Sequence, residues 1–351
     1  MAHIFKKPSN GQNGIIVLSH QETGRIENNP DLYPMVNKLL EKYFIGVHYG
    51  GFSFGAHMPQ FCHFYMGRDS VTDIKQRFPG AFHIPMASAQ FTSTKFSYNP
   101  DVSKYWDIIN VSRNAKIKKL DTFFQEVKKI YEAGYKYKIL LVCASRKEET
   151  EQDHFVNIAD VYYEMFTDEE REWFTLLRLS KDLEFKGLSK TQLAYLYQAS
   201  KVSTLFSPQE GSPGVIPEAL LTKLPVVTYK HQQGSGLDFL DNSNSILFEN
   251  YEDAHHSLIE AVENYDKFNH NMDYLIENYR EDKGIENIKT YFKKLYEIYD
   301  QQFDGELINT DDLVSRLPAH YVKLPWANKR FVNGHMTEME QFKIFEESTS
   351  E

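Results

Sequence analysis

The chain has 351 residues, 41% of them hydrophobic and 25% charged, so it is long enough for two ordinary globular domains. Its formal net charge of -10 argues against a dedicated nucleic-acid binder, which usually carries a basic surface. No signal-peptide pattern and no run of about 18 apolar residues occurs, so we expect a cytoplasmic protein without a transmembrane segment.

The first hundred residues show a short alternation of strand and helix patterns. Strands are predicted at Gly14–His20 and Ile45–Gly51, and helices at Met35–Phe44 and Ser70–Phe78, the last with Ser70 as its N-cap. The segment Phe91–Lys104 is polar and aperiodic, which is typical of a linker. We therefore predict a small α/β domain over residues 1–100.

From residue 101 to residue 300 the alternation becomes regular. Continuous apolar runs of this kind are buried on both faces of a parallel sheet. The pattern predicts a doubly wound α/β domain over 101–300, and a C-terminal extension over 301–351 that packs on the first domain. The predicted strands are Trp106–Ser112, Tyr137–Ser145, Val202–Ser207 and Pro225–Tyr229, and the predicted helices Leu120–Gly134, Ser189–Ser200, Pro213–Lys223, Ala254–Tyr265 and Gly284–Phe303.

The two cysteines, Cys62 and Cys143, are flanked by apolar or aromatic residues. Neither has the spacing of a zinc ligand, and no Asp-x-Asp metal motif has a convincing context. We expect two buried, reduced thiols and no metal.

The stretch Leu205–Val227 carries two carboxylates, Glu210 and Glu218, around a Gly-Ser-Pro-Gly turn. A glycosidase needs two carboxyl groups roughly 5–9.5 Å apart, whereas eight residues of helix span about 12 Å. This spacing suits two different ends of one ligand better than one scissile bond.

The residues between the two carboxylates indicate an anion site. Ser212 is expected to cap a helix that has Pro213 at its first position, and Gly211 and Gly214 allow a ligand to approach the backbone. A helix N-terminus at the carboxyl end of a parallel sheet suits a phosphate or diphosphate. A nucleotide-sugar fits both the anion site and the carboxylates.

Three stretches together resemble the donor-site core of the family 4 retaining glycosyltransferases, which have the GT-B fold. Gly187–Tyr229 is similar to the family's signature of two glutamates separated by seven residues, an apolar helix and a Pro-Val-Val strand. Ile109–Phe124 resembles its strand, arginine, loop, lysine and helix, and Gly234–Phe248 its glycine-rich turn, with Asp238 where an acidic residue is usual. The resemblance covers about residues 104–300 and implies two Rossmann-like domains facing a cleft, the N-terminal one shortened.

The resemblance also implies roles for individual residues. Arg113 and a lysine, either Lys118 or Lys119, would bind the diphosphate; a glycine is usual at the position of Lys119. Glu210 would contact the transferred sugar and Glu218 the ribose. Catalytic roles then fall to Glu210, Arg113 and Lys118, the phosphates would meet backbone N–H groups of Gly211, Ser212, Pro213, Gly214 and Val215, and the base would lie near Gly187 and Leu188.

The activity implied is retaining transfer of a sugar from a UDP-, GDP- or ADP-sugar to a hydroxyl of a glycan, lipid-linked or small-molecule acceptor, without a cofactor or metal. The glycine- and ring-rich stretch at His48, Gly50 and Gly51 suits either an acceptor loop or a turn that supports the first domain. The stretch Tyr321–Trp326 could contact the inner face of a membrane. A non-catalytic nucleotide-sugar-binding protein is the alternative of a different class; an epimerase or phosphorylase fits less well.

Overall fold

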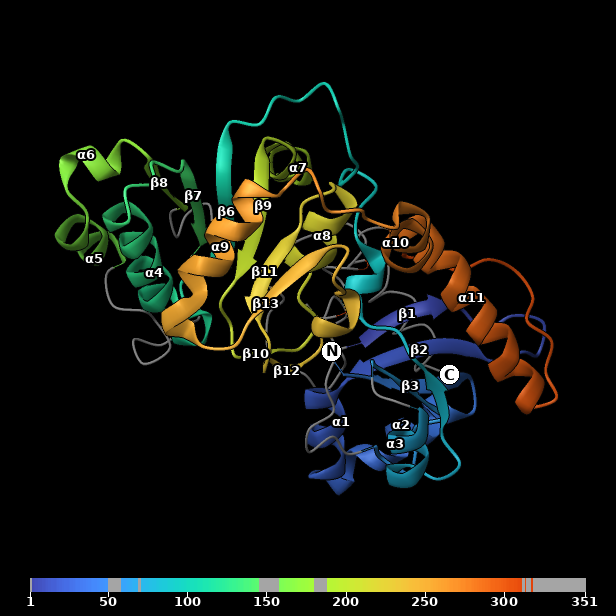
Figure 1. Ribbon diagram of the computed structural model, residues 1–351. Helices are drawn as coiled ribbons and strands as arrows, with labels where there is room; N and C mark the ends of the chain where they lie inside the picture. The colour runs from blue at the N-terminus through green and yellow to red at the C-terminus, as the bar shows by residue number, and fades with distance from the viewer. Residues whose placement is uncertain are drawn as a thin grey trace. The chain divides into compact units, whose positions relative to one another are not determined.

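The structure is a computed structural model that describes residues 2–49, 58–68, 71–144, 158–179, 188–310, 313 and 317. The chain divides into two compact units (Figure 1). Unit 1 comprises Met1–Thr92 and Glu277–Glu351, and unit 2 comprises Ser93–Ile276. The division after Thr92 lies near the start of the expected linker, but the return to unit 1 at Glu277 precedes the expected boundary at residue 300.

Unit 1 is built on a five-stranded sheet in the order β1-β2-β3-β4-β5. The strand β1 is antiparallel to β2, and the other neighbouring pairs are parallel. Three of the five strands and the helix α1 (His20–Glu27) were missing from the expected pattern, and these three strands are only three to five residues long. The strands are β1 (Ala2–Lys6), β2 (Gly14–Ser19), β3 (Tyr43–His48), β4 (Phe64–Met66) and β5 (Phe82–Ile84), and the other helices of residues 20–92 are η1 (Pro30–Leu32), α2 (Tyr33–Leu40), α3 (Val71–Arg77) and η2 (Ser88–Phe91).

The helix α11 (Glu281–Ile298) covers one face of the unit 1 sheet. Its buried residues Ile288 and Phe292 share a hydrophobic cluster with Phe5 of β1 and Ile15 of β2. The sequence assigned this helix to the domain at 101–300, because its periodicity shows an apolar face but not which sheet that face covers. After α11, Ile308 N–H donates to the Phe5 carbonyl at 2.7 Å, so this part of the chain also lies in unit 1.

Unit 2 is built on a six-stranded parallel sheet in the order β13-β11-β9-β6-β7-β8. This arrangement confirms the predicted doubly wound α/β fold. The strands are β6 (Trp106–Arg113), β7 (Ile139–Ala144), β8 (Phe174–Leu179), β9 (Ser200–Leu205), β11 (Val226–Tyr229) and β13 (Ser245–Phe248), and the helices are η3 (Lys116–Lys118), α4 (Leu120–Glu132), α5 (Ile158–Met165), α6 (Asp168–Arg171), α7 (Lys190–Gln198), α8 (Val215–Leu221), η5 (Leu237–Phe239), η6 (Tyr251–Asp253) and α9 (Ala254–Glu263), with α10 (Met272–Tyr279) ending in unit 1.

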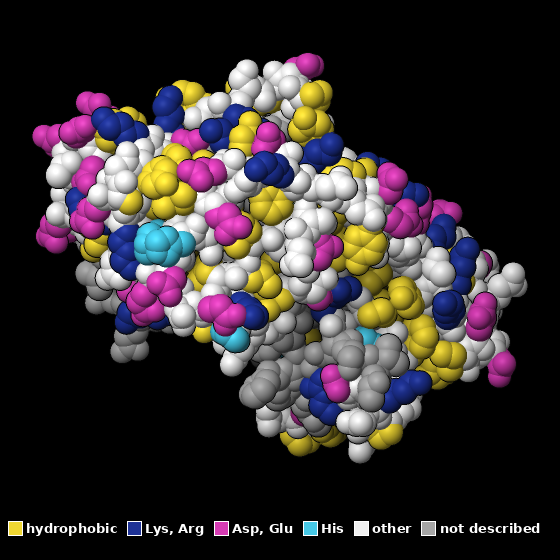
Figure 2. All heavy atoms as spheres, in the orientation of Figure 1, with side chains coloured by type: hydrophobic (Ala, Val, Ile, Leu, Met, Phe, Trp, Pro, Cys, Tyr) yellow, Lys and Arg dark blue, Asp and Glu magenta, His cyan; other side chains and the backbone are white. Residues whose placement is uncertain are grey.

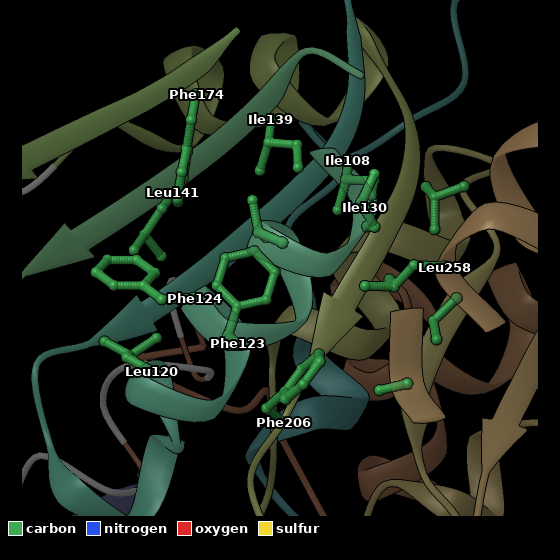
Figure 3. Packing of buried hydrophobic residues seen from close by; sticks show 14 of the residues in the cluster. Ile108, Leu120, Phe123, Phe124, Ile130, Ile139, Leu141, Phe174, Phe206 and Leu258 are labelled. Carbon is green, nitrogen blue, oxygen red and sulfur yellow. The ribbon is translucent and has the colours of Figure 1, made fainter. Parts of the chain in front are cut away.

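The main core of unit 2 lies between the sheet and the helices α4 and α9. Figure 3 shows Phe123 and Phe124 of α4 facing strand residues, with Leu258 of α9 beside them. The ring of Phe123 meets the ring of Phe206 edge-on at 5.3 Å, just beyond β9. Burial of each such ring stabilises the fold by about 1.5–3 kcal/mol. The helices α7 and α8 pack against β9 and β11 without joining this cluster, so the sheet carries helices on both faces.

Both cysteines are buried and free, Cys62 in unit 1 and Cys143 in unit 2, which confirms the expectation of two reduced thiols. Among the described residues, no helix has the length and apolar composition needed to cross a bilayer.

The close approach of α11 to η2 depends on Gly284. A Cβ at this position would lie 2.3 Å from the Gln90 carbonyl oxygen and 2.8 Å from the ring of Phe91. Gly284→Ala is therefore expected to lower the free energy of unfolding of the full chain by about 1–3 kcal/mol in urea, although alanine normally favours a helix.

Gly24→Ala is the matched control, because a Cβ at Gly24 in α1 would meet nothing within 4 Å. That substitution should be neutral or stabilise by about 0.5–1 kcal/mol. Equal unfolding midpoints for the Gly284→Ala variant and the wild type would contradict the proposed close packing.

Candidate functional site

The candidate site lies at the carboxyl edge of the unit 2 sheet, where the loops after β6, β9 and β11 begin. The loop after β9 contains β10 (Gln209–Glu210), and the loop after β11 contains β12 (Gln233–Gly234). These two short strands pair in parallel, and the Ser235 N–H donates to the Glu210 carbonyl at 3.0 Å. The ladder fixes Glu210 beside the glycine-rich turn that the sequence predicted for this site.

The glycine-rich turn requires glycine at position 236. Gly236 has φ +125°, and a Cβ there would lie 2.9 Å from both Ile216 and Pro213. Its N–H donates to the Asp238 carboxylate at 2.8 Å. The turn therefore lies directly against the start of α8, and Asp238 stabilises its conformation.

Lys118 and Glu210, both predicted site residues, form an ion pair between the Lys118 Nζ and the Glu210 Oε1. Their side chains are only 14% and 11% exposed, although 92 positions separate them in the chain. Arg113 lies half-buried at the end of β6, in the same loop region as Lys118. The structure thus brings a cation and a carboxylate together at the edge where the sequence predicted them.

The structure distinguishes the two lysines that the sequence left open. Lys119 has φ 50° and ψ 41°, a left-handed conformation that favours glycine, which explains why a glycine is usual there. Its Nζ lies 5.8 Å from the centroid of the Tyr251 ring, a cation–π contact. Lys118, not Lys119, makes the contact with Glu210.

The start of α8 differs from the prediction. The helix begins at Val215 with Gly214 at the N-cap and no side-chain cap hydrogen bond. Ser212 is therefore not the cap, and Pro213 precedes the helix instead of occupying its first position. Residues Gly211–Gly214 link β10 to the helix, so the N-cap lies two positions after the predicted cap Ser212. The turn pattern in the sequence could not show this.

Glu218 lies in the first turn of α8 with a half-buried side chain. The hydroxyl of Tyr197, on α7, donates to the Glu218 Oε2 at 3.4 Å. Burial raises the pKa of Glu218 to about 7, against the Tyr197 hydrogen bond and the positive charge of Lys190, which both lower it. The predicted N-cap of α7 is confirmed, since the Ser189 hydroxyl accepts from the Gln192 N–H at 3.2 Å.

Three residues of this region were not singled out from the sequence. Tyr197 is fully buried and contacts Glu218. Ser207 follows β9 and Asn114 follows the neighbouring strand β6; both are buried, and within the described residues the Ser207 Oγ and the Asn114 Oδ1 have no hydrogen-bond partner. Their positions at the carboxyl ends of two predicted strands were the available signal. Unpaired buried polar atoms are costly, so both atoms are suited to bind a ligand that reaches this edge.

The remaining predicted residues are outside this arrangement or outside the described residues. Gly187, Gly50 and Gly51 lie outside the described residues, and Leu188 precedes the N-cap of α7. His48 is buried at the end of β3 in unit 1. Its role in binding an acceptor stays a prediction. The described residues include no group of three or more His, Cys, Asp or Glu side chains placed to hold a metal ion.

Part of the sequence is similar to a glycosyltransferase family. A family model described as Glycosyl transferases group 1 matches residues 106–265. Residues 106–265 are thus similar to the group 1 glycosyltransferases. No curated protein is significantly similar in sequence to the chain.

Solved structures of low sequence identity share the fold. Sucrose-phosphate synthase from Thermosynechococcus elongatus is 12% identical with a TM-score of 0.57, over 81% of this chain and 74% of that one. HepE of Anabaena, solved with UDP, is 13% identical with a TM-score of 0.54, over 77% and 75%. The pneumococcal O-GlcNAc transferase GtfA, solved with UDP and GlcNAc, is 12% identical with a TM-score of 0.54, over 76% of this chain and 54% of its own.

These similarities show the GT-B fold, as the sequence predicted. The chain spans about half the length of GtfA. The segment that the family model matches, residues 106–265, lies entirely within unit 2, which carries the candidate site.

A double-mutant cycle in the ligand-free protein can measure the coupling free energy between Lys118 and Glu210. Lys118→Met and Glu210→Gln should each lower the free energy of unfolding, because either single change leaves a poorly solvated charge unpaired. The double variant should lose less stability than the sum of the two single losses. We expect a coupling free energy of about 1 kcal/mol or more, measured by urea unfolding.

The exposed pair Lys136–Glu169 is the control, with side chains 65% and 69% exposed. Its coupling should be about 0.5 kcal/mol or less. Equal coupling in the two cycles would show that the Lys118–Glu210 contact is an ordinary surface ion pair.

Proposed function

We propose that this protein transfers a sugar from a nucleotide-diphosphate sugar to an acceptor hydroxyl. The proposal rests on one observation: in a segment similar to the group 1 glycosyltransferases, Lys118 and Glu210 meet at the carboxyl edge of the parallel sheet, beside the glycine-rich turn. Open α/β sheets bind ligands at this edge.

The charges at the site suit the donor's diphosphate. Arg113 and Lys118 come from the loop region after β6, and the start of α8 directs backbone N–H groups toward the same edge. Of the backbone residues predicted there, Pro213 has no N–H, so this role falls to its neighbours. Figure 2 shows acidic and basic side chains interspersed on the visible face, so local cations, not the net charge of -10, must attract an anion.

Glu210 and Glu218 are proposed to hold the two ends of the donor. Lys118 has three N–H donors, so it can bind a phosphate oxygen while it retains one bond to Glu210. The second oxygen of Glu210 then accepts from a hydroxyl of the transferred sugar, and Glu218 accepts from the ribose hydroxyls. The developing charge on the leaving diphosphate is stabilised by Arg113, Lys118 and the backbone N–H groups, so we propose catalysis without a metal.

Transfer is proposed to retain the anomeric configuration by front-face attack. The bond between the anomeric carbon and the diphosphate oxygen breaks while the acceptor oxygen bonds to the same face of that carbon. The acceptor hydroxyl's proton passes to the departing phosphate oxygen, which serves as the base. The products are a nucleoside diphosphate and the glycosylated acceptor.

Uracil is the first nucleotide base to test, because HepE was solved with UDP and with UDP-glucose, and GtfA with UDP. A glycan or a lipid-linked hydroxyl is the proposed acceptor class, with His48 in unit 1 as the candidate contact.

Nucleotide binding is tested by thermal unfolding with UDP, GDP, ADP and CDP. A nucleotide at about 100 times its Kd stabilises the folded state by about 2.7 kcal/mol, or roughly 5–10 °C for a unit of this size. The shift should persist in EDTA. It should be lost in Lys118→Ala and kept in Lys119→Gly, because glycine suits the left-handed backbone at Lys119 and the Lys119 amine lies over Tyr251.

Absence of a shift with all four nucleotides would overturn the donor site. Equal loss in the two lysine variants would refute the assignment of Lys118. Binding without any sugar transfer to glycan acceptors would favour a non-catalytic nucleotide-sugar-binding protein instead.

Retention is tested by proton NMR of the first product formed from the UDP-sugar that is turned over. We expect the anomeric signal of the transferred sugar to have the donor's configuration, and Glu210→Gln to lower kcat by at least tenfold. Tyr163→Phe, on the exposed α5 surface, should leave turnover unchanged. A first product of opposite configuration would rule out front-face retention.

A further inference from the structure

We infer that Tyr197 is a positioning residue that orients the Glu218 carboxylate toward the nucleotide. The inference rests on the proposed function, since it assigns a partner to the carboxylate that is proposed to bind the ribose. Tyr197 touches Glu218 and is not proposed to touch the donor.

The ring of Tyr197 is held in one position. It is fully buried in the last turn of α7, and the ring of Phe96 meets it edge-on with centroids 6.0 Å apart. A buried phenol needs a hydrogen-bond partner, and the Glu218 Oε2 supplies it at 3.4 Å. This separation is longer than the typical ~2.7–2.8 Å, so the bond is weaker than a typical O–H···O bond.

The contact leaves one carboxylate oxygen for a ligand. In the part of the chain that is described, no other side chain donates a hydrogen bond to Glu218. Because Oε2 faces Tyr197, Oε1 is directed away from the α7 contact and can accept from a hydroxyl. The α8 helix fixes the backbone of Glu218, since its N–H donates to the Gly214 carbonyl at 3.0 Å.

The same contact affects the charge of Glu218. Burial favours the neutral acid, whereas Tyr197 and Lys190, both on α7, favour the carboxylate; within the described residues these are the groups that shift its pKa. The ionised carboxylate accepts hydrogen bonds from hydroxyls more strongly than the neutral acid does. Removal of the Tyr197 hydroxyl should therefore raise the pKa of Glu218 above about 7 and weaken ribose binding near neutral pH.

The test is Tyr197→Phe, which keeps the buried ring and removes only the hydroxyl. The Kd of UDP is measured by calorimetry from pH 6 to 9, together with that of 2′-deoxy-UDP and 3′-deoxy-UDP. We expect UDP to bind three- to tenfold more weakly at pH 7–7.5, and the difference to shrink by pH 9 as Glu218 ionises in both proteins. At least one deoxy nucleotide should lose this penalty, because it lacks the hydroxyl that Glu218 binds.

Two further variants complete the design. Tyr195→Phe, a 59% exposed tyrosine on the same helix, should bind UDP as the wild type does. Glu218→Gln should weaken UDP binding, and Tyr197→Phe added to it should have no further effect. All the nucleotides share the diphosphate, so its own titration cancels in the comparison.

The inference also has a test that needs no nucleotide. In the ligand-free protein, the carbon-13 shift of the Glu218 carboxyl should titrate at a higher pH in Tyr197→Phe than in the wild type. An unchanged titration together with unchanged UDP binding would overturn the inference. An equal loss of affinity for UDP and both deoxy nucleotides would show that Tyr197 only supports the fold, whereas failure of the wild type to bind any nucleotide would overturn the proposed function itself.

Discussion

The common direction of β6, β9 and β11 is the constraint on which the candidate site depends. Because these neighbouring strands are parallel, their following loops begin at one edge of the sheet, although Arg113 and Glu210 are 97 positions apart in the chain. The two-residue β10–β12 ladder and the contact between Phe206 and Phe123 then hold the loops in place. An antiparallel arrangement would place Lys118 and Glu210 at opposite ends of the sheet, and no shift of side chains could bring them together.

In the proposed function, the Lys118–Glu210 pair would link recognition of the diphosphate to recognition of the transferred sugar. In the ligand-free protein each charge is the other's partner, which offsets the cost of their burial. A diphosphate that binds to Lys118 draws positive charge away from Glu210, and the carboxylate then gains from hydroxyl donors on the sugar. A free phosphate supplies no such hydroxyls. Sugar and phosphate together therefore satisfy both side chains better than either group does by itself, which favours the intact nucleotide-sugar.

The sequence predicted the features that depend on local pattern and order along the chain. Apolar runs separated by helices identified the parallel sheet of unit 2, and the Glu210–Glu218 spacing with its glycines identified the site loop. Features set by tertiary packing were not accessible: neither the Lys118–Glu210 contact nor the left-handed backbone at Lys119 can be read from the sequence, and Tyr197 looks like any apolar-face residue until α8 is placed beside it. The start of α8 at Val215, not near Ser212, was missed because the β10–β12 ladder joins residues 24 positions apart.

The placement of α11 explains how a short N-terminal segment forms a complete unit. Residues 1–92 supply a sheet whose face at Phe5, Ile15 and Phe64 would be exposed if no other element covered it. Ile288 and Phe292 of α11 cover that face, and Gly284 allows the helix to approach the Gln90 backbone closely. Unit 1 is thus discontinuous in sequence, whereas residues 106–265 lie in the continuous segment Ser93–Ile276. The segment that the family model matches therefore belongs to a unit built from one stretch of chain, whereas unit 1 is completed only by residues from Glu277 onward.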